Sequence, residues 1–432
     1  MDRLRNLVVL LRSQLWIVPL ILSALALSLA FWVLTSEASF LEVRNVGGFW
    51  WLYGGDASSA RDLMSSLLSG LMTMTSLVVS VTFVILTLAA NQLGPRLIST
   101  FMGDRQIQTV LGLFLGTILY VLVILRSLDE TLGTEGVPHV AVTIGSVLTG
   151  VCLFALLFYV HKIANAIIAD NIVARVAEDL HRNICSILPK EDSRIARAAP
   201  PMQLRAGSVS LAQSGYIQVI NYDELVSVAS KAKCMLQVKV RAGHFVFRRG
   251  DHVVVFGQSP LDSASEDAVR RAFLVGGQRS PAQDLEFGIR QLVEIALRAL
   301  SPGINDPYTA VAVIDRLGAS LEEIMHRTLR PSILYDESDE ARVLAQQSDI
   351  QGMMDAAFDA IRQSGSGTPT VLIRMADVLG QLAPADCSDD ETRDAVASHL
   401  QKLAEAAEAA AFTPLDRRAV LQRVEGAAAA MK

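Results

Sequence analysis

Hydroxyl side chains follow one face of an uncharged segment in the N-terminal part of the chain. Residues 64–90 contain nine Ser or Thr residues and no charged residue. On a helix, five of the hydroxyls fall within an arc of about 60°: Ser69, Thr73, Ser76, Ser80 and Thr87. Such a stripe can line a water-filled path, because hydroxyls are weak ligands that an ion enters and leaves easily. Small polar residues also let helices pack closely in lipid, so pore lining and helix packing both stay open.

A second candidate set lies in the C-terminal half, where Glu286 and Arg290 stand four residues apart on a predicted helix. This spacing is typical of a surface ion pair worth a few tenths of a kcal/mol. The chain has no nucleotide-binding, metalloprotease or serine-hydrolase motif. Its four cysteines have no metal-ligand spacing, and none of its seven histidines stands four residues from another. We therefore expect no catalytic residue, no metal and no cofactor.

The run Ser-Pro-Gly-Ile-Asn-Asp-Pro at residues 301–307 predicts the end of one helix and the start of the next. Gly303 suits a left-handed helix end, Asp306 an N-cap and Pro307 the first helical position. Together with Asn305, these residues form a turn whose expected role is structural.

Four stretches of the first 162 residues carry no charge, and each supplies about the 20 apolar residues needed to cross a bilayer core roughly 30 Å thick. One charge at the bilayer centre costs about 2.5–3.5 kcal/mol, so four such gaps predict four transmembrane helices. The predicted spans are about 14–35, 64–90, 107–125 and 138–160. Because no span carries Asp, Glu, Lys or Arg, a pump or coupled transporter is disfavoured.

Two further spans carry pairs of small residues one helical turn apart. The third span contains Gly112 and Gly116, and the fourth contains Ser146 and Gly150. Small residues at this spacing allow helix backbones to approach closely within lipid. We expect both pairs to pack against other helices.

Charge also predicts the orientation of the spans. With the N-terminus inside, eight Lys or Arg residues near span ends lie on the inner side and three on the outer side. Basic residues prefer the cytoplasmic side, so both termini are expected there. No basic stripe interleaved with aromatic residues is present, which argues against nucleic acid as a partner.

The rest of the chain predicts a cytoplasmic α+β domain. A helical extension and connector is expected at residues 163–200, with the fourth span continuing as one helix to Ile187. A small strand-rich part follows at 201–260 and a helical part at 281–432. Alternating apolar and polar residues predict the strands: Tyr216–Ile220, Met235–Val240 and His252–Phe256. A short helix is expected at Asp223–Lys231, and only helices after Pro281.

Several motifs resemble a bacterial family of predicted membrane proteins known as domain of unknown function 2254. The resemblance rests on Asp284-Leu-Glu-Phe-Gly-Ile-Arg-Gln-Leu-Val, on Ala299-Leu-Ser-Pro-Gly-Ile-Asn-Asp-Pro-Tyr-Thr-Ala310, on Asn91-Gln-Leu-Gly-Pro-Arg96 and on Gly215-Tyr-Ile-Gln-Val. It covers nearly the whole chain. It implies four spans, a cytoplasmic domain and a bacterial inner membrane, and it adds no activity or catalytic residue.

The preferred hypothesis is a homo-oligomeric, channel-like protein of the inner membrane. Four spans enclose little space, so a pore would need several copies of the chain, with the second span around the axis. Without ionisable residues in the spans, such a pore would be at most weakly selective among inorganic ions. The cytoplasmic domain would hold or gate the assembly. The alternative is a membrane-anchored sensor or scaffold whose cytoplasmic domain binds a ligand or partner.

Overall fold

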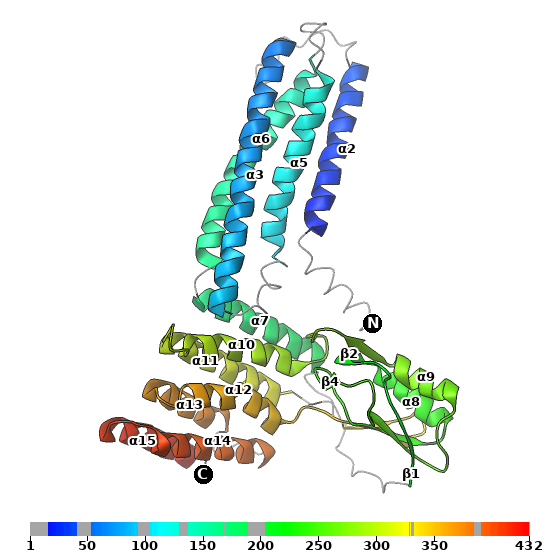
Figure 1. Ribbon diagram of the computed structural model, residues 1–432, viewed down its shortest axis with the longest axis vertical. Helices are drawn as coiled ribbons and strands as arrows, with labels where there is room; N and C mark the ends of the chain where they lie inside the picture. Colours follow the sequence, from blue (N-terminus) through cyan, green and yellow to red (C-terminus); the bar gives the residue numbers. More distant parts are fainter. Residues whose placement is uncertain are drawn as a thin grey trace. The chain divides into compact units, whose positions relative to one another are not determined.

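The computed structural model describes residues 16–40, 53–93, 104–128, 137–166, 169–188, 204–327, 329, 332–383 and 390–431. The chain divides into two compact units, an N-terminal unit of residues 7–168 and a C-terminal unit made mainly of residues 169–432. The N-terminal unit is helical, and the C-terminal unit combines helices with two small sheets (Figure 1).

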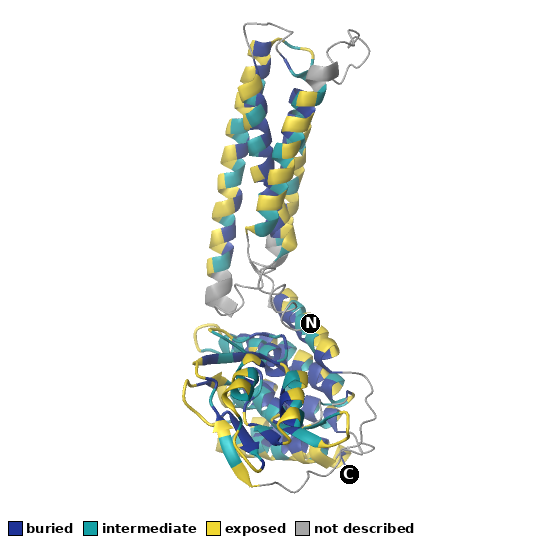
Figure 2. Ribbon diagram, turned by 90° about the vertical axis from the view of Figure 1, so that its right-hand side faces the viewer, coloured by how far each residue is buried: buried dark blue, intermediate teal, exposed yellow. Residues whose placement is uncertain are grey.

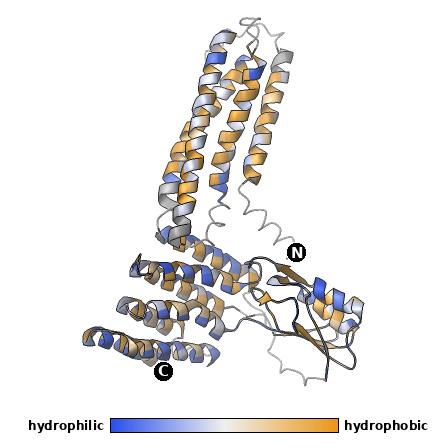
Figure 3. Cartoon of the chain, viewed as in Figure 1, coloured by the Kyte–Doolittle hydropathy of each residue, from blue (hydrophilic) through white to orange (hydrophobic). Residues whose placement is uncertain are grey.

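Long apolar helices make up the described part of the N-terminal unit. They are α2 (Ile17–Phe40), α3 (Ala57–Leu93), α5 (Arg105–Ser127) and α6 (His139–Ala166). Each contains a stretch long and apolar enough to cross a membrane, and hydrophobic residues predominate along them (Figure 3). The four predicted spans are confirmed, although α3 begins at Ala57, before the predicted start.

Helix α5 packs against α2, α3 and α6. On α3, buried residues recur every seven positions: Met64, Leu71, Val78 and Ile85. They join one apolar cluster with Phe114 and Tyr120 of α5, and the Tyr120 hydroxyl donates to the Ala141 carbonyl at 3.1 Å. Within lipid there is no water to exclude, so close packing of this kind holds the helices together.

Charged groups of the unit lie near helix ends. Asp104 caps α5 by accepting a hydrogen bond from the Gln106 backbone N–H at 2.9 Å. Its carboxylate also pairs with the Lys162 ammonium of α6 at 2.6 Å, with both side chains largely buried. This pair ties the start of α5 to the C-terminal part of α6.

Some predicted features fall outside the described residues. They are the start of the first span at 14–15, the loops at 41–52 and 129–136, residues 94–96 of the Asn91–Arg96 motif, and the connector at 189–200. The long helix expected after the fourth span is described as two helices, α6 and α7 (Ala169–Ile187). Residues 167–168 between them are not described.

The helices of the C-terminal unit form stacked pairs (Figure 1). The pairs are α10 (Leu285–Ala299) with α11 (Pro307–Met325), α12 (Ile350–Ser364) with α13 (Pro369–Leu382), and α14 (Asp390–Ala409) with α15 (Pro414–Ala430). Helix α7 packs on the first pair. A Cβ atom at Gly288 of α10 would lie 2.9 Å from Leu180 Cδ1 of α7, so these two helices approach closely.

Two sheets share one hydrophobic core in the C-terminal unit. The larger has the order β1 (Arg205–Val209), β5 (Val253–Phe256), β3 (Met235–Val238), β8 (Ala341–Ala345), β7 (Ile333–Tyr335). The smaller has the order β4 (Phe245–Val246), β2 (Gly215–Ile220), β6 (Phe273–Gly276). Helices α8 (Tyr222–Lys231) and α9 (Ser263–Arg271) flank them. Neighbouring strands are antiparallel except β3 and β8, which are parallel.

The three predicted strands and the short helix α8 are confirmed. The expectation of helices alone after Pro281 is wrong, because β7 and β8 lie there and complete the larger sheet. Strand β8 is short and its parallel partner β3 lies far away in the sequence. Local periodicity carries no sign of such a pairing.

The turn between β7 and β8 predicts a dependence of stability on pH. Asp336 accepts hydrogen bonds from Arg342 Nε at 2.6 Å, from the Glu340 and Ser338 backbone N–H groups at 3.0 Å, and from Ser230 of α8 at 3.1 Å. These bonds, the one from Arg342 above all, lower the pKa of Asp336 to about 2 from 3.8. The stabilisation is therefore present above pH 3.8 and lost as the pH falls through about 2.

We expect Asp336→Asn to lower the unfolding midpoint near neutral pH, with a deficit that shrinks as the pH falls from about 4 to about 2. Circular dichroism melts of both proteins across this range would measure it. Glu337→Gln, which removes an exposed carboxylate next to it, is the matched control and should leave the pH profile unchanged. A deficit that stays constant with pH would contradict the assigned role.

Candidate functional site

The hydroxyl stripe of α3 lies on the exposed face of that helix. All five of its residues are exposed in the single chain: Ser69, Thr73, Ser76, Ser80 and Thr87. Figure 2 shows how exposed faces run along the helices of this unit. Thr73 and Thr87 donate to the carbonyls of Ser69 and Phe83 one turn earlier, so their oxygens remain available as acceptors. The stripe thus offers weak oxygen ligands to whatever faces it.

The opposite side of α3 turns toward the other helices of the unit. Thr75 is half-buried, and Thr82 is buried with its hydroxyl bonded to the Val78 carbonyl at 2.6 Å and to the Tyr159 hydroxyl. Tyr159 in turn donates to the Val78 carbonyl at 3.1 Å. Apolar and aromatic side chains occupy the interior that the described helices share. These side chains leave no room for a water-filled path between the described helices of a single chain.

The two small-residue pairs have different surroundings. A Cβ at Gly112 would lie 2.7 Å from Leu22 Cδ1 and 2.9 Å from Pro19 Cα, and one at Gly116 would lie 3.1 Å from Ala26 Cβ. The first pair therefore sits directly against α2. Gly150 has open space where its Cβ would be, and the hydroxyl of Ser146 donates to the Val142 carbonyl of its own helix.

The turn between α10 and α11 is built by backbone and N-cap hydrogen bonds. Asp306 is the N-cap of α11, accepting from the Thr309 N–H at 3.1 Å and from its hydroxyl at 2.6 Å, and Pro307 is the first helical residue. The Thr309 hydroxyl bond lowers the pKa of Asp306. The left-handed residue is Asn305, with φ of 51°, and the expectation for Gly303 is wrong. Asn tolerates this conformation because its short polar side chain bonds locally.

Glu286 is buried, contrary to the surface ion pair expected for it. Its side chain is 4% exposed and pairs with Arg241 of the β3–β4 connection at 2.5 Å and with Arg290 at 3.0 Å. Burial raises the pKa of Glu286, but the two arginines outweigh that effect and hold it below its ordinary value. Two cations around one buried carboxylate make this a structural ionic centre.

A second ion pair adjoins that centre. The Asp284 carboxylate accepts from Arg279 Nε at 2.7 Å, yet burial raises the pKa of Asp284 above its usual value. Gly243 passes close to this pair at φ of 89°, where a side chain would be both strained and in the way. A small polar pocket lies beside the centre, lined in part by Tyr222, Arg241, Gln283 and Ser348.

Two groups of potential metal ligands occur among the described residues. Asp355 and Asp359 of α12 face His399 of α14, but the Lys402 ammonium already pairs with these carboxylates at 2.7 and 3.1 Å. Burial, followed by the Lys402 charge, lowers the pKa of His399. The Lys402 ammonium therefore already supplies the positive charge between these two carboxylates.

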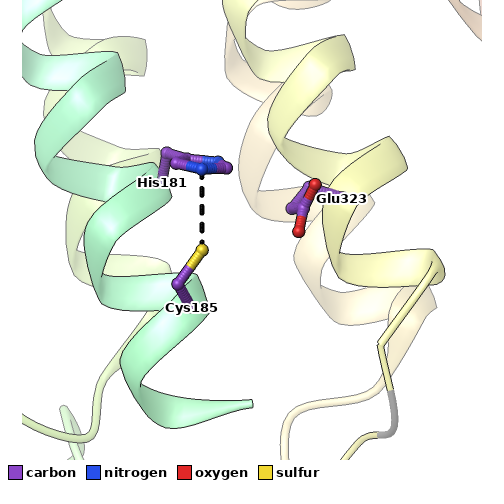
Figure 4. Close-up of side chains that lie close together, drawn as sticks. All are labelled: His181, Cys185 and Glu323. Atoms are coloured by element: carbon purple, nitrogen blue, oxygen red, sulfur yellow. Dashed lines mark hydrogen bonds between the residues drawn. The ribbon is translucent and has the colours of Figure 1, made fainter. Parts of the chain in front are cut away.

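The other group joins α7 to α11 (Figure 4). His181 and Cys185 stand one turn apart on α7, with the Cys185 Sγ atom 3.5 Å from His181 Nε2. Glu323 of α11 lies opposite, and all three ligand atoms are within 4.8 Å of one another. The absence of a metal remains a prediction. This group has the ligand types that could hold a metal ion.

Two arrangements of the C-terminal unit were not predicted from the sequence: the pairing of Glu286 with Arg241, and the group His181, Cys185 and Glu323. No two histidines stand four residues apart in the sequence, but His181 and Cys185 do. Arg241 stands 45 residues before Glu286, its ion-pair partner, so no local spacing connects the two residues. The i, i+4 spacing of His181 and Cys185 is therefore a signal visible in the sequence, whereas the pairing of Arg241 with Glu286 has no such signal.

The fold defines the class of protein first: a membrane protein with four spans and a C-terminal α+β unit. A family model described as predicted membrane protein (DUF2254) matches residues 12–381, and the chain belongs to this family, as its motifs indicated. Uncharacterised proteins of Mycobacterium bovis and Mycobacterium tuberculosis are each 29% identical over 377 residues, or 86% of this chain and 72% of theirs. No solved structure matches the chain.

Proposed function

We propose that the protein forms a homo-oligomer in the bacterial inner membrane, in which the hydroxyl faces of α3 from several copies line a weakly selective path for inorganic ions. The C-terminal unit lies on the cytoplasmic side and holds or gates this assembly. The orientation rests on the excess of Lys and Arg expected at the inner ends of the spans.

The observation that carries the proposal is the position of the stripe. The five hydroxyls of the stripe are exposed, while the packed side of the same helix is apolar apart from Thr75 and the Thr82–Tyr159 contact. In a single chain the stripe would face lipid, where hydroxyls gain nothing over the apolar residues beside them. Around a central axis the same oxygens would replace part of an ion's hydration.

The absence of charge in the spans supports weak rather than strong selectivity. Neutral hydroxyls carry no net charge that would favour cations or anions, so discrimination would depend on pore width and on charges at the mouths. The path we propose therefore differs from a coupled transporter, whose mid-membrane ionisable groups are costly and functional.

A second candidate function is a membrane-anchored sensor. The observation that favours it is the polar pocket beside Glu286, to which Arg241, Gln283 and Ser348 contribute. Arg241 already donates to Ser348 Oγ at 2.6 Å, so a small anionic or polar ligand could compete for that guanidinium.

Cysteine accessibility in membranes separates the two functions. We expect single cysteines at Thr73, Ser76 and Ser80 to react with small charged thiol reagents, because water reaches a pore-lining face. Thr75 and Thr82, on the packed side, should stay protected. Phe154 of α6 is the matched control, since it is 75% exposed in the single chain but apolar. A cysteine there should also stay protected, because lipid would cover it.

Planar-bilayer recording would complete the test of conduction. Reversal potentials in a salt gradient should show a small selectivity, and block by thiol reagents should require a cysteine on the stripe. If all the cysteines on α3 are as protected as the one at Phe154, the pore is refuted and the sensor becomes the better hypothesis.

A further inference from the structure

The group His181, Cys185 and Glu323 carries an inference that is independent of the proposed ion path. Its two helices, α7 and α11, pack against each other: α7 buries Val176, Leu180 and Ile184, and Leu180 also lies against Gly288 of α10. His181 and Cys185 stand at the edge of this interface, and Glu323 reaches them from α11. The packing beneath fixes the separation between the ligands on the two helices.

The ligand set suits a borderline-soft divalent ion. An imidazole nitrogen, a thiolate sulfur and a carboxylate oxygen are the donors that Zn²⁺ uses in proteins. In a tetrahedral site with Zn–N near 2.0 Å and Zn–S near 2.3 Å, the nitrogen and sulfur lie about 3.5 Å apart. The His181 Nε2 and Cys185 Sγ atoms are 3.5 Å apart. The pair on α7 is therefore already spaced for coordination, and water would complete the fourth position.

A buried arginine holds two of the three ligands. Arg327 is 5% exposed at its side chain and donates to Glu323 Oε1 at 2.6 Å and to Cys185 Sγ at 3.0 Å. Its third bond, to the Leu188 carbonyl at 3.0 Å, anchors it at the end of α7. Donors of this kind orient metal ligands. The guanidinium also repels a cation, but the thiolate and carboxylate together balance the two charges of Zn²⁺.

The contrast with the Asp355, Asp359 and His399 group decides between the two candidates. There the Lys402 ammonium lies on both carboxylates, so a metal would have to displace it. Arg327 likewise contacts the Cys185 sulfur and one Glu323 carboxylate oxygen, but both Cys185 and His181 are exposed to solvent, whereas His399 is 1% exposed. An ion can therefore reach the His181 and Cys185 side chains directly from solvent.

We propose that His181, Cys185 and Glu323 bind Zn²⁺ and thereby clamp α7, the first helix of the C-terminal unit, to α11. Binding replaces the thiol proton, which passes to solvent, since the thiolate is the metal ligand. The clamp joins the helix that follows the last span in the sequence to the stacked helices.

The test uses the full chain in detergent, carrying a purification tag without histidine and stripped of metal by a chelator. Zn²⁺ titration against a chromophoric chelator should give about one ion per chain. Cys185→Ser and Glu323→Gln should each weaken binding at least about 100-fold, because even outer-shell changes cost 10–100-fold. Glu322→Gln removes the same charge from the neighbouring, exposed position and should leave the affinity unchanged.

Two measurements on the unmutated protein keep the proposal testable if a variant fails to fold. Co²⁺ should produce a thiolate-to-metal absorption band in the near ultraviolet, and Zn²⁺ should slow alkylation of Cys185, followed by peptide mass mapping. The proposal is overturned if no thiolate band forms and alkylation is unaffected. It is equally overturned if the Cys185→Ser and Glu322→Gln proteins bind Zn²⁺ alike.

Discussion

Arg241→Met should lower the free energy of unfolding of the C-terminal unit by about 3–5 kcal/mol, the usual cost of removing one partner from a buried ion pair. Glu286 is 4% exposed and Arg241 is 20% exposed, so water screens their contact little. Of its two partners among the described residues, the carboxylate then keeps Arg290, whose side chain is 51% exposed. Chemical unfolding of the full chain in detergent, followed by circular dichroism, would measure the loss.

Arg290→Met is the matched control, because it makes the same change at the same carboxylate. Its cost should stay within about 1 kcal/mol, as for other exposed ion pairs. The double variant Arg241→Met with Glu286→Met should recover much of the loss, since it removes the buried charge as well. Equal costs for the two arginines would show that Glu286 does not depend on Arg241.

The same centre has a pH dependence of known sign. The pKa of Glu286 is held below its ordinary value of 4.5 in the folded protein. Its stabilisation is therefore fully present above that pH and is lost as the pH falls through the lower folded-state value. The deficit of Arg241→Met should accordingly shrink in acid.

Gly112→Val should destabilise the packing of α2 on α5 by about 1–3 kcal/mol, the typical cost of overpacking. The new Cβ would lie 2.9 Å from Pro19 Cα, a backbone atom that no rotamer change can move, and 2.7 Å from Leu22 Cδ1. Thermal unfolding in detergent should therefore begin at a lower temperature. A disulfide between cysteines placed at Ala26 and Gly116, where a Cβ on Gly116 would lie 3.1 Å from the Ala26 Cβ, would report the loss of helix contact directly.

Gly150→Val provides the control, because nothing lies within 4 Å of a Cβ at that position. It adds the same branched side chain to a span of similar hydropathy and should leave the single chain's stability nearly unchanged. If Gly112→Val is tolerated as well as Gly150→Val, the close contact between α2 and α5 is not what holds those helices together.

The features that depend on residues close together in the sequence could be predicted. They include the membrane spans and several helix ends. Uncharged stretches identify membrane helices because every charge in lipid is costly. The Asp306 N-cap and the Pro307 start were also visible, since capping involves neighbours in sequence. The left-handed conformation of Asn305 was not predicted, because glycine adopts positive φ angles more readily and Gly303 stands two positions earlier.

Features that depend on distant segments could not be predicted. The i, i+4 spacing of Glu286 and Arg290 on α10 revealed the more exposed of the two ion pairs of Glu286. The other partner, Arg241, comes from the connection between β3 and β4. His181 and Cys185 lie on α7 but acquire Glu323 only through the packing of α7 on α11. In each case the fold supplies the partner that gives the residue its role.

The place of β8 in the larger sheet has a consequence for biosynthesis. Strand β3 pairs with β5 on one side and with β8 on the other, so its second edge stays open until the chain has been made through Ala345. Ribosomes deliver the strands β1 to β6 well before that point, and an uncovered apolar strand edge invites pairing with other chains. The half-made protein therefore passes through an aggregation-prone stage that ends only when β8 is inserted.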